Sequence, residues 1–251
     1  MKNSIERFSN RVENYVKYRP GYPPEMLEVF RGEMNLTPES LIADIGSGTG
    51  ISAKVFLENG NTVIGVEPNK AMREAAEEYL RAFPKFQSID GTAENTNLEP
   101  GSIDIVIAAQ AFHWFDPEKT RAEFQRILRP GGSAALIWNE RRLTGDEFHE
   151  GYEKLLLKYG NDYERVRHEN VDENILSGFF RSDFKRETLE NAQVLDYEGL
   201  LGRLLSSSYM PTETDDRFAP LNAELHALFA KHSEHGMIKV LYDTNIFYTQ
   251  L

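Results

Sequence analysis

A short strand that runs into a glycine-rich turn is the feature that most constrains how this chain can fold. The apolar run Leu41–Ile45 precedes glycines at positions 46, 48 and 50, and a helix is predicted over Ile51–Asn59. Glycines at such a junction let the backbone turn tightly and let a ligand approach without an intervening Cβ atom. The unit favours an α/β fold whose ligand site lies beyond the carboxyl ends of the strands.

The alternation of strand and helix continues to about residue 138. Strong helix formers occupy Asn69–Ala82, and Asp116 with Pro117 suits the N-cap and first turn of a later helix. Further strands are predicted at Thr62–Val66, Phe86–Ile89, Ile103–Ala109 and Ser133–Trp138. Five strands joined by crossover helices predict a doubly wound, Rossmann-like parallel sheet.

The rest of the chain has a less regular pattern. Arg141–Leu176 is predicted to be mostly helical. Later come a strand at Phe184–Val194, helices at Tyr197–Leu205 and Leu221–His232, and two β-rich runs within Met237–Gln250, around Asp243-Thr244-Asn245. A late strand left alone would expose an unpaired edge, so we expect these strands to join the same sheet, with the last one antiparallel.

These patterns together predict one domain over residues 1–251, built on a seven-stranded mixed sheet. Residues 1–40 would form an N-terminal helical lid, residues 41–140 the cofactor-binding core, and residues 141–251 a helical insertion with the closing strands. The sequence does not predict an oligomeric state.

Composition excludes several classes of function. The 28 Lys and Arg residues against 40 Asp and Glu give a net charge of −12, which disfavours binding to nucleic acid. The absence of cysteine excludes disulfides and thiolate metal ligands, and the six histidines have no metal-ligand spacing, so no metal site is predicted. With neither a signal-like N-terminus nor a long apolar run, we expect a cytoplasmic protein that does not enter a membrane.

The residues around the glycines indicate the charge of the ligand. A dinucleotide fingerprint needs a sixth-position glycine, where this chain has Ile51. The carboxylate of Asp44 would repel a pyrophosphate but would attract an ammonium or sulfonium group. Glu67 follows the second strand, where a carboxylate can accept hydrogen bonds from both ribose hydroxyls. A glycine turn without a ligand and a solvated Glu67 are the alternatives.

Five segments in order carry a resemblance to a known family: Asp44–Gly50, Val66–Asn69 with Met72, Gly91–Glu94, Gln110–Asp116 and Leu128–Gly132. They resemble the successive motifs of the seven-stranded (class I) S-adenosylmethionine-dependent methyltransferases. More narrowly, Tyr18–Pro23 and Phe112–Asp116 look like the small-molecule branch related to trans-aconitate methyltransferase, also described as methyltransferase type 11. The resemblance covers about residues 8 to 140.

The resemblance implies S-adenosylmethionine as the cofactor and a set of residues that bind it. Asp44 would hold the amino group, Glu67 the ribose, and Ala93 the adenine edge through its backbone N–H. Thr92 stands where the family often has Asp, and Glu94 would compensate or remain solvated. The full implied set is Tyr18, Arg19, Asp44, Gly46, Ser47, Gly48, Gly50, Glu67, Pro68, Met72, Thr92, Ala93, Glu94, Gln110 and Ala111. Tyr15 would join Tyr18 and Arg19 in a lid over the cofactor; the alternative is that the three residues only anchor the N-terminal helix.

His113 and Trp114 would face the methyl acceptor, although both could be ordinary packing residues. A hydroxyl or carbon acceptor needs a general base, and His113 is the motif residue with a suitable pKa, whereas a carboxylate needs none. Arg141, or alternatively Arg19 or Arg142, could clamp a carboxylate, and Arg203 is a weaker candidate.

The predicted activity is methyl transfer to a small organic acceptor, through a carboxylate or hydroxyl, by in-line displacement. The alternatives are a catalytically silent adenosylmethionine-binding regulatory protein and a nicotinamide oxidoreductase, the latter disfavoured by Ile51 and Asp44. No Asn/Asp-Pro-Pro-aromatic tetrapeptide follows the fourth strand, which argues against methylation of exocyclic amines on nucleic-acid bases.

Overall fold

One mixed sheet of seven strands organises the protein, in the order β3-β2-β1-β4-β5-β7-β6. The computed structural model describes residues 17–161, 163, 173–181, 183–207 and 209–251. The strands are β1 (Leu41–Ile45), β2 (Thr62–Val66), β3 (Phe86–Ile89), β4 (Ile103–Ala109), β5 (Leu128–Arg141), β6 (Lys185–Leu195) and β7 (Ile238–Gln250). Strands β1 to β5 are parallel and β7 is antiparallel to both of its neighbours, which confirms the predicted sheet.

The antiparallel part of the sheet is longer than the sequence pattern predicted. β5 begins at Leu128 and ends at Arg141, well outside the expected strand at Ser133–Trp138. The expectation of two β-rich runs near the C-terminus was wrong, because β7 is continuous. Its middle residues, Asp243–Asn245, favour turns in isolation. Here they pair with β5 on one side and with β6 on the other, so the two ladders hold them extended.

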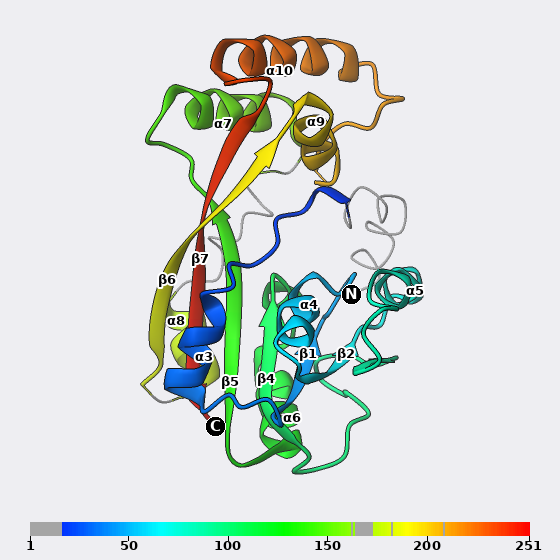
Figure 1. The fold of residues 1–251 in the computed structure, drawn as a ribbon, viewed down its shortest axis with the longest axis vertical. Helices are drawn as coiled ribbons and strands as arrows, with labels where there is room; N and C mark the ends of the chain where they lie inside the picture. Colours follow the sequence, from blue (N-terminus) through cyan, green and yellow to red (C-terminus); the bar gives the residue numbers. More distant parts are fainter. Residues whose placement is uncertain (1–16, 162, 164–172, 182, 208) are drawn as a thin grey trace.

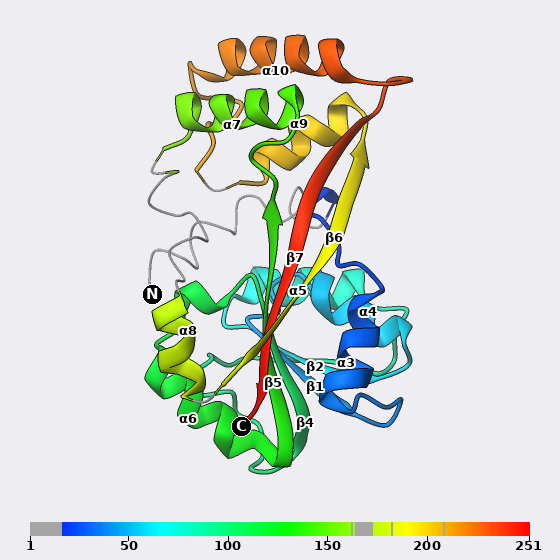
Figure 2. The same cartoon turned by 90° about the vertical axis from the view of Figure 1, so that its left-hand side faces the viewer.

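Helices cover both faces of the parallel strands (Figure 2). On one face lie α3 (Met26–Met34) and α4 (Ile51–Glu58), where the rings of Phe30 and Phe56 meet edge to face at 5.0 Å. On the other face lie α6 (Pro117–Ile127) and α8 (Glu173–Phe180), while α5 (Lys70–Tyr79) packs near β3. The predicted start of α6 is confirmed, since the Asp116 side chain accepts a hydrogen bond from the Lys119 N–H.

Three more helices form a separate layer that we call the roof: α7 (Glu147–Tyr159), α9 (Tyr197–Leu205) and α10 (Phe218–His232). Figures 1 and 2 show them together beyond the carboxyl ends of the parallel strands, reached by the long ends of β5, β6 and β7. Their apolar side chains form a cluster of their own with Val240 and Tyr242 of β7. None of the helices in the described ranges has the length and apolarity needed to cross a membrane.

A buried histidine fixes the roof to the sheet. His149 of α7 is 1% exposed, and its Nδ1 lies 2.7 Å from the carboxylate of Asp146, the N-cap of that helix. Its Nε2 accepts a hydrogen bond from the backbone N–H of Leu241 in β7. Both ring nitrogens are therefore engaged, and α7 is held to the upper end of β7.

Packing under α8 gives a test of the fold. The Phe179 ring is buried and meets Phe112 at 4.7 Å and Phe124 at 5.8 Å. We expect Phe179→Ala to lower the free energy of unfolding by about 3–5 kcal/mol, because the neighbouring rings cannot collapse into the cavity. Val194→Ala is the control: Val194 is 60% exposed, so a change within about 0.5 kcal/mol is expected. Equal losses in denaturant unfolding would contradict this packing.

Candidate functional site

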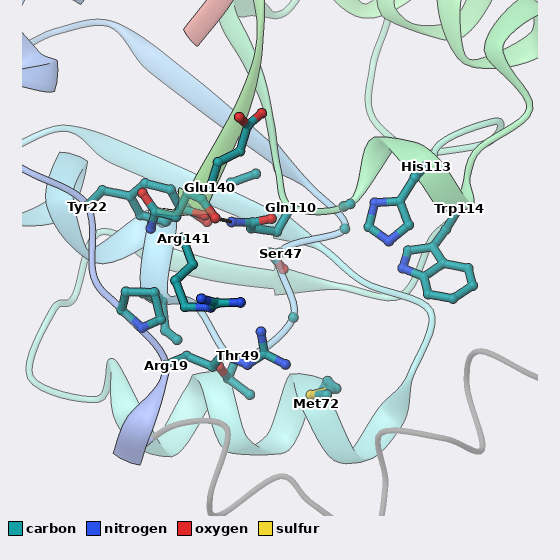
Figure 3. A pocket seen from close by; sticks show the side chains of 18 of the residues that line it. Arg19, Tyr22, Ser47, Thr49, Met72, Gln110, His113, Trp114, Glu140 and Arg141 are labelled. Carbon is teal, nitrogen blue, oxygen red and sulfur yellow. Dashed lines mark hydrogen bonds between the residues drawn. The ribbon is translucent and has the colours of Figure 1, made fainter. Parts of the chain in front are cut away.

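A cavity of about 760 Å³ lies where the carboxyl ends of β1, β2 and β4 face the roof. Figure 3 shows Arg19 and Tyr22 on one side, His113 and Trp114 on the other, and Ser47 and Thr49 between them. Its walls come from the glycine turn, the ends of β2, β4 and β5, the N-terminal segment and the roof. Its volume lies within the range of about 300–1,000 Å³ that is typical of small-molecule and cofactor pockets.

The glycine turn needs its glycines for two different reasons. All three have positive φ, at 69° for Gly46, 54° for Gly48 and 83° for Gly50. A Cβ on Gly46 would lie 2.7 Å from the Cβ of Ala111, so the turn packs tightly on the end of β4. A Cβ on Gly48 would meet no atom within 4 Å, which leaves its backbone open to the cavity. The turn therefore presents bare main chain to a ligand.

Glu67 is held in place by main-chain donors. It follows β2, lines the cavity, and accepts hydrogen bonds from the N–H groups of Gly48 at 3.1 Å and Asn69 at 2.8 Å. Burial raises the pKa of its carboxyl. A carboxylate fixed in this way at the strand end can accept hydrogen bonds from ligand hydroxyls without reorganising first.

Asp44 lies beneath the turn and is fully buried, so it does not line the cavity wall. Its Oδ2 accepts a hydrogen bond from Ser52 Oγ at 2.6 Å, whereas Oδ1 has no partner among the described residues. Burial, with Glu67 nearby, raises the pKa of Asp44 to about 7. An unpaired buried acceptor is costly, so this oxygen fits a ligand that brings a positively charged donor.

The other predicted cofactor residues divide into two groups. Ser47, Pro68, Met72, Gln110 and Ala111 line the cavity. The cavity is not lined by Gly50, Thr92, Ala93 or Glu94. A Cβ on Gly50 would meet Leu80. Thr92 Oγ1 accepts a hydrogen bond from the Asn95 N–H, and Glu94 accepts one from the Asp116 N–H at 2.9 Å.

His113 and Trp114 stand together on the short 3-10 turn η1 (Phe112–Trp114), with ring centroids 4.8 Å apart. Both line the cavity, and Trp114 is 38% exposed. Burial lowers the pKa of His113 to about 4, because desolvation disfavours the charged imidazolium. The sequence-based expectation of a pKa suited to general-base catalysis near neutrality was wrong for this reason, and the ring is neutral at pH 7.

Residues 17–22, which we call the strap, run from the roof to the cavity. Tyr18 donates through its OH to Glu198 of α9, and Arg19 Nη2 donates to the carbonyl of Ser206 at 3.2 Å. Arg19 and Tyr22 line the cavity, whereas Tyr18 packs on Gly202 of α9 instead. Tyr15 lies outside the described residues, and closure of this segment over the cofactor stays a prediction.

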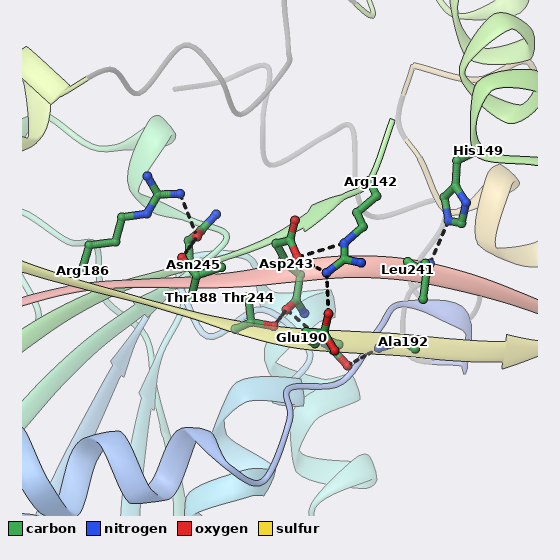
Figure 4. A network of polar contacts seen from close by, with 12 residues as sticks. Arg142, His149, Arg186, Thr188, Glu190, Ala192, Leu241, Asp243, Thr244 and Asn245 are labelled. Atoms are coloured by element: carbon green, nitrogen blue, oxygen red, sulfur yellow. Dashed lines mark hydrogen bonds and ion pairs between the residues drawn. The ribbon is translucent and has the colours of Figure 1, made fainter. Parts of the chain in front are cut away.

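The two arginines predicted at the end of β5 are both in ion pairs. Arg141 lines the cavity and is bound to Glu153 of α7, with Tyr163 OH at 3.3 Å. Arg142 pairs with Asp243 at 2.7 Å and with Glu190 at 3.0 Å (Figure 4). Both guanidinium charges are thus already balanced by carboxylates.

Several cavity residues were not in the predicted site. They include Thr49, Asn139, Tyr163, Tyr209 and Asp243, while Arg203, a weaker candidate from the sequence, also lines the cavity. Most belong to the roof or to the long strands, where no local motif marks a ligand site. Within the described ranges, no group of three or more His, Asp or Glu side chains is arranged to hold a metal ion.

Comparison with known proteins identifies similar chains. A family model described as a methyltransferase domain matches residues 43–136. An uncharacterized methyltransferase of Mycobacterium tuberculosis is 33% identical over 230 residues, covering 88% of this chain and 87% of its own. A Saccharomyces cerevisiae protein described as a "probable S-adenosylmethionine-dependent methyltransferase" is 33% identical over 49% of this chain and 43% of its own.

Among solved structures, a protein of Anaeromyxobacter dehalogenans assigned as a type II methyltransferase superposes with a TM-score of 0.67. It is 25% identical in sequence, and the match covers 93% of this chain and 98% of that one. The likeness therefore includes the roof and the long strands as well as the glycine-turn core.

A glycine-to-alanine substitution, which adds one methyl group, tests the contact between the strap and the roof. A Cβ on Gly202 would lie 2.2 Å from a Tyr18 ring atom, so we expect Gly202→Ala to displace the strap and speed hydrogen exchange of its amides. Gly178→Ala is the control, because Gly178 is also helical but has nothing within 4 Å of its Cβ position. Unchanged strap exchange in Gly202→Ala would show that Tyr18 does not dock there.

Proposed function

This chain belongs to the S-adenosylmethionine-dependent methyltransferases, and on that premise we propose that it methylates a small organic acceptor at a carboxylate or hydroxyl oxygen. One observation carries the proposal: a single cavity joins the glycine turn to a chamber under the roof that is walled by aromatic and cationic side chains. The net charge of −12 further disfavours a nucleic-acid acceptor.

The residues on the cavity wall, together with Asp44 buried beneath the glycine turn, fit the cofactor. Adenosylmethionine, when bound, supplies an electrophilic methyl group on a sulfonium. Glu67 would accept hydrogen bonds from the ribose hydroxyls, and the unpaired Oδ1 of Asp44 would receive the cationic amino group. Gly48 leaves the space for this approach, while Met72 would pack against the adenine.

The protein's own contribution is then alignment and exclusion of water. An in-line displacement needs the acceptor oxygen held at the methyl group, and such alignment lowers the barrier by up to several kcal/mol. The strap, with Arg19 and Tyr22, closes one side of the cavity, and Trp114 forms part of the opposite wall. The roof covers the space between them, where the acceptor would lie.

The state of His113 bears on the choice of acceptor. A neutral imidazole with a pKa of about 4 is a weak base at pH 7. It can accept a hydrogen bond from a hydroxyl acceptor, but it provides little driving force for removing the proton. A carboxylate is already ionised and needs no base, and the resemblance to the trans-aconitate branch also supports it.

Turnover tests the proposal directly. The purified protein is incubated with methyl-labelled adenosylmethionine and a panel of carboxylic acids, phenols and quinone precursors, and methylated products are identified by mass spectrometry. We expect at least one oxygen-methylated product. Binding of adenosylmethionine with no product from any member would instead favour a catalytically silent regulatory protein.

The raised pKa of Asp44 predicts a pH dependence of cofactor binding. Above about pH 7 the carboxyl is ionised and attracts the ligand's amino group. Below that pH it is protonated in the free protein, so affinity should fall by up to about tenfold per pH unit. Calorimetry with adenosylhomocysteine between pH 5.5 and 8 measures this.

Two variants complete the measurement. Asp44→Asn should bind more weakly at pH 8, by about 1.5–3 kcal/mol for a lost charged hydrogen bond, with a flatter pH dependence. Glu78→Gln, on the exposed side of α5, should behave as the wild type. A wild-type affinity that stays constant from pH 8 to 5.5 would remove Asp44 from the binding site.

A further inference from the structure

Arg203 is a roof arginine that has no ion-pair partner among the described residues. The residue lies on α9 and lines the cavity. Its Nε donates to Tyr242 OH at 3.1 Å and its Nη1 to Ser207 Oγ at 3.3 Å. No carboxylate of the described residues lies within ion-pair distance, and no described residue accepts a hydrogen bond from Nη2. Part of the guanidinium fork therefore remains available to a ligand.

Arg141 and Arg142, at the end of β5, differ from Arg203 because both are in ion pairs. Arg141 is paired with Glu153, and Arg142 with Asp243 and Glu190 (Figure 4). These pairs satisfy the carboxylates of Glu153, Asp243 and Glu190 as well as the two guanidinium groups. Asp243 is therefore balanced by Arg142 and leaves the charge of Arg203 uncompensated.

The groups that surround Arg203 are phenols and the hydroxyl of Ser207. Tyr242 accepts a hydrogen bond from Nε, with the guanidinium Cζ 5.9 Å from the ring centroid, and donates its own OH to Gln193 at 2.8 Å. Burial raises the pKa of Tyr152, so this neighbouring phenol also stays un-ionised. A partly buried cation without a counter-charge is unfavourable, and an anionic ligand would relieve that cost.

The pairing of the strands shows how far Arg203 lies from the glycine turn. β4 ends at Ala109, which is paired with Ile137 of β5, whereas Tyr242 is paired with Arg141. The interval is four residues along β5, or roughly 13 Å at about 3.3 Å per residue. An anion at Arg203 would thus lie at the far end of the cavity from the turn.

We propose that Arg203 binds an anionic group at one end of the acceptor, a carboxylate or a sulfonate, while an oxygen at the acceptor's other end receives the methyl group. The free edge of the guanidinium suits two parallel hydrogen bonds to such a group. This inference rests on the proposed function and names the class of acceptor within it.

The test compares acceptors that differ only in the charge of one end. The probes are 4-hydroxycinnamate and adipate, each beside its amide analogue, 4-hydroxycinnamamide and the adipic acid monoamide. Arg203→Met removes the charge with little change in length, and Arg203→Lys keeps the charge but loses the fork. Arg81→Met is the matched control, an exposed arginine that follows the C-cap of α5.

We expect at least one acid to be methylated by the wild type with a KM roughly ten- to hundredfold below that of its amide. Arg203→Met should remove this preference by raising the KM for the acid alone, and Arg203→Lys should restore it in part. Arg81→Met should keep the wild-type ratio. A purely structural Arg203 would instead change the acid and the amide equally, and that result would overturn the proposal.

Binding provides a second readout that does not require turnover. With adenosylhomocysteine at saturation, millimolar acid should raise the thermal midpoint of the wild type and not that of Arg203→Met, while adenosylhomocysteine itself stabilises both proteins. Acids that stabilise neither protein would overturn the proposal. Arg203-dependent stabilisation without methyl transfer would refute the proposed function and leave the anion site standing. Methylation of acids and amides at equal rates would support the proposed function and refute the anion site at Arg203.

Discussion

The ladder between β5 and β7 is the interaction on which the rest of the molecule depends. It runs from Ser133 paired with Gln250 to Arg141 paired with Tyr242. Its lower half lies in the core of the parallel sheet, where Ile246 packs with the residues that α3 and α4 cover. Its upper half leaves that core and ends in the roof cluster with Tyr242. Because the ladder is continuous, the roof stands in a fixed position over the carboxyl edge of the sheet, and the cavity exists between them.

Asn139 of β5 joins the elements that enclose this cavity. Its Oδ1 accepts from Thr244 Oγ1 at 2.5 Å, its Nδ2 donates to the Gly21 carbonyl of the strap, and its backbone carbonyl accepts from Gln110. The cavity they enclose has opposite charges in excess at its two ends. The glycine-turn end has buried carboxyls with raised pKa values, and the roof end has the unbalanced guanidinium of Arg203. Each imbalance favours a ligand of opposite charge, because unpaired buried groups are unfavourable in the free protein and a ligand that pairs with them removes that cost.

Much of the architecture could be predicted because it is encoded locally. β1, β2, β3 and β4 have the predicted bounds, since short apolar runs between turn residues determine such strands, and β1, β2 and β4 are mostly buried. The middle of β7 was read as a break, because Asp243–Asn245 has the composition of a turn and only the neighbouring ladders keep it extended. The pKa of His113 was misjudged for a similar reason: burial, which the sequence pattern does not report, shifts it away from neutrality.

The sequence by itself determined the glycine turn, the carboxylates beside it and the parallel sheet that positions them. These features depend on residues close together in the chain, whose backbone preferences and periodicity can be read directly. The tertiary structure alone decided which arginine is available to an acceptor. Arg141 and Arg142 are neutralised by Glu153, Asp243 and Glu190, which come from α7, β7 and β6, whereas Arg203 meets only phenols and a hydroxyl. A charge's partner is set by distance in space, and that distance is fixed only when the roof and the long strands have packed together.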